Sequence, residues 1–403
     1  MPSRTVEQSW ELYDRAIEVI PMAVQTHSKS PREALRGTEP CFMVKGKGCR
    51  VWDLDGNEYI DFRYGMGPIT LGYCFPAVDE AVRRQLEDGI LFCYSHPLEV
   101  EVAERLVQII PCAERVRFLK TGGEAMAAAH RMARAFTGRD MLLTCGYHGW
   151  INTVSRPGVP DVTRSTYQSM PWADISPYRE AFESMPDQIA AVSVACGYPD
   201  MDKGDPFLSE LRALTEEHGS LLIFDEIVTG FRLRRGGAQE FFGVTPDLAV
   251  FAKGISNGMP LSCYLGRADI MDSVKDVTIS STFGGESLSL AAAKAVLDTY
   301  EKEDVVGTLW ARGKQLHDGF NNICRELDVP AYFRGYPPLG QMIVERSNSS
   351  ELLLRLQEQL IKRGIIPYSV YYSCFSHTES DIDLTLTAMR EGLTEMVEQG
   401  HFE

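Results

Sequence analysis

Short apolar runs that alternate with helical segments are the feature that most constrains the fold of this chain. The runs do not alternate between apolar and polar residues, as strands with one exposed face do. Strands that are buried on both faces and joined by helices are typical of a parallel sheet. The predicted strands are residues 116–119, 141–144, 189–195, 221–224, 248–252 and 261–265, and the predicted helices include residues 124–136 and 207–218. The pattern predicts an α/β fold with a mainly parallel sheet flanked by helices.

Two of these runs are followed by residues of opposite charge. Asp225 follows the run 221–224, and Lys253 follows the run 248–252. Ligands bind at the carboxyl ends of strands in open α/β sheets, so the acid and the amine are expected at one edge. A lysine forms Schiff bases with aldehydes, and a carboxylate keeps a pyridine nitrogen protonated. On this pair alone, however, a salt bridge between strand ends is the favoured interpretation.

The two ends of the chain differ from the central pattern. Residues 5–20 have the periodicity of an amphipathic helix, and residues 42–62 alternate like a small antiparallel meander around an Asp-Gly-Asn turn. The C-terminal part combines long helical patterns with a short strand, which is typical of a small α+β unit. The predicted division is a small domain made of residues 1–65 and 306–403, and a large domain made of residues 66–305.

Composition and charge argue against several classes of partner. The 403 residues, of which 44% are hydrophobic and 24% charged, are typical of a globular protein with more than one structural unit. The formal net charge of −16 argues against nucleic acid or an anionic membrane as a partner. No apolar stretch approaches the ~18–20 residues of a membrane span, and the N-terminus lacks the apolar core of a signal peptide. A cytoplasmic location is therefore expected.

The ten cysteines are scattered singly along the chain. No two form a Cys-x-x-Cys pair, so no metal site is predicted. Most of them lie within apolar runs, which favours buried free thiols.

Two glycine-containing turns that precede predicted helices are suited to phosphate binding. Gly122 and Gly123 follow the strand 116–119, and Thr282 lies in the Ser-Thr-Phe-Gly-Gly-Glu segment 281–286. Unpaired N–H groups at the start of a helix bind phosphate well. Either turn by itself is also typical of an ordinary helix cap, and most such turns bind nothing.

Aromatic and basic side chains supply further candidates. Tyr147, His148 and Trp150 follow the predicted strand 141–144, where a ring can stack on a flat cofactor, although such rings are more often part of a lid or core. Lys29 and Arg32 lie in a polar loop that suits a substrate anion, although loops are commonly polar. The aromatic residues of segment 368–375 fit a pocket and a core equally well.

In combination, these groups resemble the class III aminotransferases, which are fold-type I enzymes that use pyridoxal 5′-phosphate. Within them the chain is most similar to the glutamate-1-semialdehyde aminomutase-like branch. The resemblance extends from residues 51–61 to residues 377–383 and is carried by three matches. They are Tyr147-His148-Gly149, Asp225-Glu226-Ile227-Val228-Thr229-Gly230-Phe231-Arg232, and Lys253, which stands 28 residues after Asp225.

The resemblance implies a role for each matching residue. Lys253 would hold the cofactor as a Schiff base and move the proton between substrate and cofactor, and Asp225 would pair with the pyridine nitrogen. The implied cofactor-binding residues are Gly122, Gly123, Tyr147, His148, Asp225, Ile227, Lys253 and Thr282. Tyr147 and Ile227 would flank the ring, and Thr282 would reach the cofactor phosphate of a neighbouring subunit. The resemblance thus implies a homodimer with shared active sites.

At three places the chain departs from the family pattern. Gly123 stands where the family often has Ser or Thr, and Val194-Ala195-Cys196 stands where Met-Glu-Pro is common. Lys29 is the nearest equivalent of the carboxylate-binding arginine of the aminomutases, with Arg32 three residues on. A lysine provides a point charge but not the bidentate fork of an arginine.

The expected activity is amino transfer from a small-molecule amino donor to an aldehyde or ketone acceptor, with Lys253 and Asp225 as catalytic residues. Lys29, Arg32 and Trp150 are the candidates for substrate binding. The alternatives are an aminomutase, racemase or lyase on the same scaffold, because each begins with loss of a proton or group at Cα. A non-catalytic scaffold protein with this fold is a remote alternative.

Overall fold

The computed structural model describes residues 4–196 and 200–402, and the chain divides into two compact units. One unit combines both ends of the chain, Met1–Phe75 and Gly307–Glu403, and the other consists of Pro76–Val306. The first boundary lies later than residue 65, because residues 66–75 pack within the unit of the chain ends. Tyr73 forms a β-bridge with Gly48, and its hydroxyl donates to Asp61 Oδ2 at 2.7 Å.

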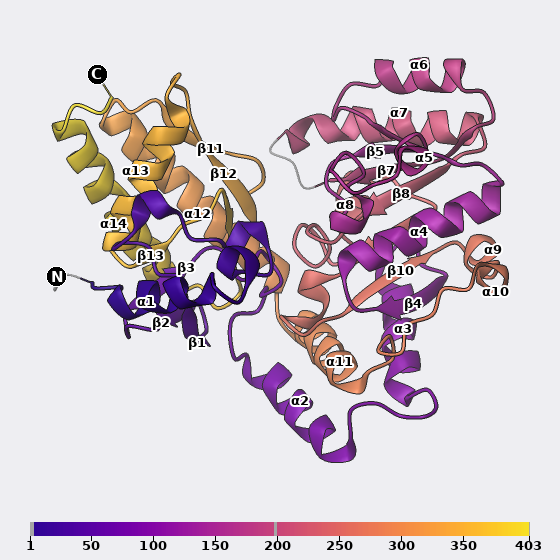
Figure 1. Ribbon diagram of the computed structural model, residues 1–403, viewed down its shortest axis with the longest axis horizontal. Coiled ribbons are helices and arrows are strands. Elements are labelled where there is room, and N and C mark those ends of the chain that lie inside the picture. Colours follow the sequence, from indigo (N-terminus) through magenta and orange to yellow (C-terminus); the bar gives the residue numbers. More distant parts are fainter. Residues whose placement is uncertain (1–3, 197–199, 403) are drawn as a thin grey trace. The chain divides into compact units, whose positions relative to one another are not determined.

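The central unit contains a seven-stranded sheet (Figure 1). In spatial order the strands are β4 (Arg115–Leu119), β10 (Ser262–Gly266), β9 (Leu248–Phe251), β8 (Leu221–Asp225), β7 (Ile189–Ala195), β5 (Met141–Cys145) and β6 (Tyr167–Ser169). The five strands from β9 to β6 run parallel, whereas β10 is antiparallel to both of its neighbours. The prediction of a mainly parallel sheet is confirmed. The sequence analysis missed β6, a three-residue edge strand with two exposed polar residues.

Helices cover both faces of this sheet. The longer helices are α2 (Pro76–Asp88), α3 (Pro97–Ile109), α4 (Gly122–Thr137), α6 (Ser176–Ser184), α7 (Gly204–Glu217) and α11 (Ser287–Lys302). The short helices are α5 (Asp161–Arg164), α8 (Ala238–Phe242), α9 (Ala268–Met271) and α10 (Val274–Val277). In Figure 1 the strands β5, β7 and β8 are seen between α7 and α4, and both of these helices contact the sheet. The buried face of α4 is rich in alanine, so this helix approaches the strands closely.

Helix α4 begins and ends at clear sequence signals. Thr121 and Glu124 form a capping box, in which the Thr121 hydroxyl accepts from Glu124 N at 3.3 Å. Gly138 ends the helix with a left-handed φ of +66°. These signals place the N-terminus of α4 directly after β4, at the edge of the sheet where β8 and β9 also end.

The unit of the chain ends contains two smaller sheets. The first has the order β1 (Met43–Lys47), β2 (Arg50–Asp53), β3 (Glu58–Asp61) and β13 (Ile365–Ile366), and the second has the order β11 (Ala331–Arg334), β12 (Leu339–Val344) and β14 (Val370–Tyr372). Strand β13 pairs parallel with β3, which joins the two ends of the chain. The remaining helices are α1 (Glu7–Ala16), α12 (Val305–Glu326, which crosses the unit boundary), α13 (Ser349–Lys362) and α14 (Glu379–Glu398).

An apolar core holds this unit together. Tyr371 packs at its centre, with its ring centroid 5.5 Å from that of Phe62 and 5.1 Å from that of Phe333. Tyr372 is also buried, so the core interpretation holds for these two aromatic residues. Most of the cysteines are buried, as expected, but Cys74 and Cys93 are exposed.

Two further observations concern the described residues as a whole. No helix among them has an apolar stretch of sufficient length to cross a membrane. Within the same residues, no three His, Cys, Asp or Glu side chains are grouped so that they could hold a metal ion.

Candidate active site

Asp225 is a buried carboxylate at the carboxyl end of a central strand. It is the last residue of β8, all of whose residues are buried, and it is 5% exposed. Its Oδ1 accepts a hydrogen bond from Ile227 N at 3.1 Å, and its Oδ2 lies 2.9 Å from His148 Nδ1. A buried carboxylate needs such hydrogen-bond partners, because an unpaired buried polar group is costly. The two contacts hold the Asp225 side chain at the sheet edge.

The neighbouring acid, Glu226, has a structural environment instead. It is fully buried, and its carboxylate accepts from Ala238 N at 2.7 Å and from Gln239 N at 2.9 Å. The Thr229 hydroxyl donates to it as well. Burial raises the pKa of Glu226 to about 7, and these hydrogen bonds oppose the shift. Glu226 therefore organises the backbone that follows β8, and Asp225 is the acid at the sheet edge.

A buried row of polar side chains continues from Asp225. His148, in the loop after β5, contacts His130 of α4 edge-on, with 6.0 Å between ring centroids. His130 lies 3.1 Å, nitrogen to oxygen, from the Ser193 hydroxyl on β7. Burial, together with the charges of His148 and Arg134, lowers the pKa of His130 to about 3, so the His130 ring is neutral at pH 7. The sequence analysis missed His130 and Ser193, because a lone histidine within a helical pattern carries no signal.

Lys253 lies at the end of β9, the strand adjacent to β8. It begins a short 3₁₀ turn (Lys253–Ser256) with a φ of +47°, which is uncommon for a residue with a side chain. Burial lowers the pKa of its amine to about 8, although the charge of Asp225 raises it. No ion pair joins Lys253 to Asp225, both of which belong to the described part of the chain. The salt bridge that the two residues alone would suggest is therefore not formed.

The first glycine turn brings three backbone segments into close contact. A Cβ added to Gly149 would lie 2.5 Å from Gly123 Cα, and a Cβ added to Gly122 would lie 2.5 Å from Ile227 Cδ1. A Cβ at Gly123 would lie 3.3 Å from Gly149 Cα, which is a tight contact. The N–H groups of Gly122 and Gly123 have no hydrogen-bond partner within residues 4–196 and 200–402.

The second glycine turn lies beside the first. Lys120 Nζ is 3.3 Å from Glu286 Oε2, and both side chains are largely buried. A Cβ added to Gly284 would lie 2.8 Å from the carbonyl oxygen of Phe118, at the end of β4. Glu286 also caps α11, accepting from Ser289 N at 3.0 Å. The structure thus brings the two predicted phosphate turns together, and Thr282 is exposed on the second of them.

The remaining candidates near the sheet edge differ in burial. Tyr147 is 68% exposed and Trp150 is 80% exposed, on either side of the buried His148. Ile227 is partly buried and packs against the core cluster of the sheet. Asn152 fixes this loop by donating to the carbonyl oxygens of His148 at 2.7 Å and Gly123 at 3.0 Å.

Lys29 and Arg32 lie in the unit of the chain ends, and their environments differ. The Arg32 guanidinium donates to both carboxylate oxygens of the buried Glu39, at 3.0 and 2.8 Å, and to Gln357. The guanidinium of Arg32 is thus occupied by groups of the chain itself, and its role in binding a substrate anion stays a prediction. Lys29 is exposed and forms no ion pair with any described residue.

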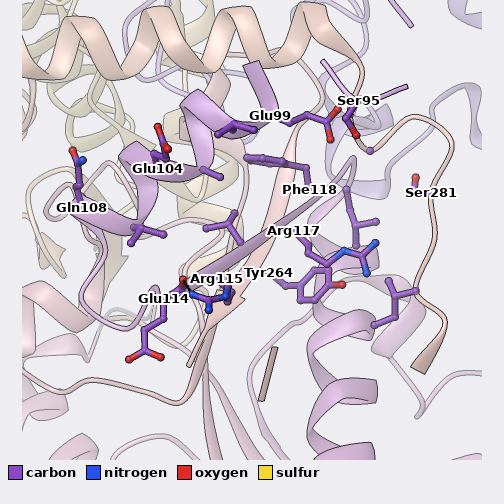
Figure 2. A pocket seen from close by; sticks show the side chains of 18 residues that line it. Ser95, Glu99, Glu104, Gln108, Glu114, Arg115, Arg117, Phe118, Tyr264 and Ser281 are labelled. Atoms are coloured by element: carbon purple, nitrogen blue, oxygen red, sulfur yellow. Dashed lines mark hydrogen bonds between the residues drawn. The ribbon is translucent and has the colours of Figure 1, made fainter. Parts of the chain in front are cut away.

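A separate hollow of about 970 Å³ opens between α3, β4 and the loop that precedes α11. Figure 2 shows Arg117 and Tyr264 close together in its wall, with Ser281 on the loop beside them. Neither Asp225 nor Lys253 lines it. The hollow is therefore distinct from the sheet edge that carries the acid and the amine.

Comparison with known proteins identifies the family. The sequence pattern of the family described as "Aminotransferase class-III" matches residues 34–374. The chain is 32% identical to 3-aminobutyryl-CoA aminotransferase of Cloacimonas acidaminovorans, over 96% of this chain and 97% of the relative. It is 35% identical to glutamate-1-semialdehyde 2,1-aminomutase of Syntrophobacter fumaroxidans, over 95% and 96%.

A solved structure agrees with the sequence relatives. The FumI protein of Sphingopyxis sp. MTA144, in its form with pyridoxal phosphate, superposes with a TM-score of 0.90 and 25% identity, and the match covers 98% of both chains. Its fold is the fold-type I arrangement expected for this chain. The chain therefore belongs to the class III aminotransferases, which use pyridoxal 5′-phosphate as their cofactor.

Proposed function

We propose that this aminotransferase moves an amino group from a donor amino acid to an aldehyde or ketone, with Lys253 and Asp225 as its catalytic residues. One observation carries the proposal: a buried carboxylate and an amine with a pKa of about 8 end adjacent parallel strands without forming an ion pair. Two groups of opposite charge that lie at one sheet edge without pairing with each other leave room for a third group between them.

The side chains fit pyridoxal phosphate. When bound, this cofactor supplies an aldehyde that condenses with amines and a ring that accepts electrons from the substrate Cα. The Asp225 carboxylate, oriented by His148 and Ile227 N, is suited to hold a proton on the ring nitrogen. The unpaired N–H groups of Gly122 and Gly123 are suited to the phosphate.

Lys253 is suited both to hold the cofactor and to move a proton. Because burial lowers its pKa to about 8, an appreciable fraction of the amine is uncharged near neutral pH and can act as nucleophile and base. Tyr147 on the exposed side and Ile227 on the core side would flank the ring. His148 would act through Asp225, and Lys29 and Trp150 remain our candidates for substrate binding.

We further propose a cytoplasmic homodimer in which Thr282 reaches the phosphate of the partner's cofactor. The support is an exposed apolar surface beside the Thr282 loop. Ser287 N donates to Ile90 O at 2.9 Å, which ties that loop to the segment after α2. The segment exposes Leu91, Phe92 and Tyr94, the last of them 87% exposed. Large exposed apolar patches mark sites of association.

A second candidate function is an aminomutase. It is favoured by the 35% identity to glutamate-1-semialdehyde 2,1-aminomutase, whose reaction needs the same acid and amine. The two activities differ in what leaves the enzyme. An aminotransferase given an amino donor alone releases one keto product per active site and stops, whereas an aminomutase turns over without net release of a keto product.

The experiment is a screen of amino donors on the purified holoenzyme, with and without a carbonyl acceptor. We expect stoichiometric conversion of the cofactor by the donor alone, and steady turnover once the acceptor is added. Lys253→Ala should reduce turnover by at least about 10⁴-fold. Lys294→Ala, which removes a lysine paired with Glu101 on the surface, is the matched control and should keep activity. Turnover by Lys253→Ala at the wild-type rate would rule the assignment out.

A further inference from the structure

A cavity in the unit of the chain ends has the size of a small-molecule site. It has a volume of about 650 Å³ and is bounded by the loop that follows α1, by β1 and β2, and by the segment after β3. Its apolar lining includes Val24, Phe42, Val51, Met66 and Ile366. Its charged lining residues are Lys29, Lys45, Asp61 and Arg63. Ligand sites typically have volumes of ~300–1,000 Å³ and a few polar groups in an apolar wall. We call it the Arg63 cavity.

Arg63 is held in place without a carboxylate partner. Its guanidinium stacks on Tyr368, 5.0 Å from the ring centroid, and its Nη2 donates to the carbonyl oxygen of Ser28. It forms no ion pair with any residue that the structure describes. Arg32, three residues from Lys29 in sequence, is by contrast paired with the buried Glu39. The structure thus leaves one arginine fork open in this region, and it is that of Arg63.

The acid in the same wall, Asp61, forms no ion pair with the arginine, although both residues are described. Asp61 is buried, and its carboxylate accepts from Arg63 N at 2.7 Å, Tyr64 N at 3.1 Å and Tyr73 Oη at 2.7 Å. The Asp61 oxygens therefore accept hydrogen bonds from two backbone N–H groups and from the Tyr73 hydroxyl. Lys45 lies over the ring of Trp52, and Lys29 is exposed at the cavity.

The local charge opposes the charge of the whole protein. The chain carries a formal net charge of −16, yet this cavity has three cationic side chains and a single acid. A local cationic cluster attracts small anions even on an acidic protein. One hydrogen of the Arg63 guanidinium is used by Ser28 and one face by Tyr368, so a single edge remains, which matches the two oxygens of a carboxylate.

We propose that the Arg63 cavity binds a small carboxylate, with Arg63 as its main contact and Lys29 adding charge. The aliphatic part of the ligand lies against the apolar wall formed by residues such as Val51 and Ile366. Where the carboxylate belongs to a substrate, the proposal rests on the proposed function, because Lys29 is also a candidate there for substrate binding. The carboxylate can come from a substrate or from an effector, and both share this chemistry.

The test uses a matched pair of probes, butanoate and butanamide, which differ in charge but hardly in shape. Their binding to the full-length holoenzyme is measured by isothermal titration calorimetry at constant ionic strength. The wild type should bind butanoate at least about ten-fold more tightly than butanamide, since a hydrogen bond to a charged group contributes that much. Equal affinity for the two probes would overturn the proposal.

Variants identify the residue responsible. Arg63→Met should weaken butanoate binding by about 10- to 100-fold and leave butanamide binding unchanged, and Lys29→Met should weaken it less. Arg355→Met is the matched control, because Arg355 pairs with Glu351 on the surface of the same unit. An Arg63→Met variant that binds butanoate like the wild type would overturn the proposal. So would an equal loss in Arg355→Met, since that would indicate a general charge effect.

Two further measurements keep the result interpretable. If Arg63→Met unfolds at a much lower temperature than the wild type, Arg63→Lys replaces it, because lysine keeps the charge but not the fork. Weaker butanoate binding by folded Arg63→Lys supports the site, and unchanged binding overturns it. Competition between butanoate and the amino donor assigns the carboxylate to a substrate, and binding without competition assigns it to an effector. Binding is read without turnover, so its failure is distinct from failure of the proposed amino transfer.

Discussion

The sheet edge of the central unit and the Arg63 cavity of the chain-end unit both present charged groups, but they are built differently. At the sheet edge, Asp225 and Lys253 are terminal to buried strands, and their positions follow from the strands themselves. In the cavity, Lys29 and Arg63 come from different loops, and Tyr368, on which Arg63 stacks, comes from a third that is distant in sequence. The residues of a site on strand ends are positioned by local structure. The residues of a site on loops are positioned by contacts between side chains that are distant in sequence.

The contacts of the charged side chains show the same difference between the two regions. The Asp225 carboxylate contacts Ile227 N, two residues away, and His148 in the loop after β5. The Arg32 guanidinium instead contacts Glu39 and the distant Gln357. The four predictions below test whether the sheet edge is rigid and pre-arranged, and whether the arginines of the chain ends divide into a structural one and a free one.

The largest effect is expected from Asp225→Asn. Loss of the charge removes the group suited to keep the ring nitrogen protonated, and should lower kcat/KM by about 10²- to 10⁴-fold, as for other positioned acids. The measurement is the rate of cofactor conversion by an amino donor in a single turnover. Wild-type rates in Asp225→Asn would show that the acid at the sheet edge has only a structural role.

Gly149→Ala should show how tightly the sheet edge is packed. Its Cβ would lie 2.5 Å from Gly123 Cα, so the variant should lose about 1–3 kcal/mol in free energy of unfolding and bind the cofactor more weakly. Gly158→Ala is the matched control, because Gly158 has a φ of +88° against +87° for Gly149 but has open space around it. The two glycines share nearly the same positive φ, so equal losses in urea unfolding would mean that the contact contributes nothing.

Arg32→Met tests the chain ends. It leaves the buried Glu39 carboxylate without its fork and should cost about 1–3 kcal/mol in free energy of unfolding. Arg63→Met should cost less, because Arg63 has no carboxylate partner within the described residues. Thermal melts of the two variants, beside Arg355→Met as a surface control, make the comparison. A larger loss for Arg63→Met would reverse the roles assigned to the two arginines.

The smallest effect is a pH dependence of cofactor capture by the apoenzyme. Because the pKa of Lys253 is lowered to about 8, the uncharged fraction of its amine should rise about ten-fold between pH 7 and pH 9. The rate of Schiff-base formation should rise with pH and level off above pH 9. In Asp225→Asn the midpoint should move to lower pH, because Asp225 raises the pKa of Lys253. A midpoint near 10.5 in the wild type would contradict the burial of this amine.

Much of the fold could be predicted because it depends on local patterns. Six strands of the central sheet were expected within a residue or two of their observed ends, since buried strands are continuous apolar runs. The exception, β6, has only three residues and lies at the sheet edge, where exposed polar residues hide the pattern. The start of α4 was also predictable from a local pattern, because Thr121, Glu124 and the two glycines lie close together in the sequence.

The parts that could not be predicted depend on distant contacts. His130 and Ser193 are ordinary residues of a helix and a strand until the fold places them beside His148. Arg63 was overlooked because a lone arginine after a strand carries no signal, whereas Arg32 lies in a basic, polar loop that drew attention.

By itself, the sequence determined that an acid and an amine end two neighbouring buried strands, because both strand ends are local features of the chain. Only the tertiary structure decided that these two residues do not pair with each other, since no ion pair joins Asp225 and Lys253. It also decided which arginine stays free, because Glu39 and Gln357 occupy Arg32, whereas Tyr368 and the Ser28 carbonyl hold Arg63 without neutralising it. The pairing of a charged side chain depends on residues that are adjacent only after folding, and no local pattern records it.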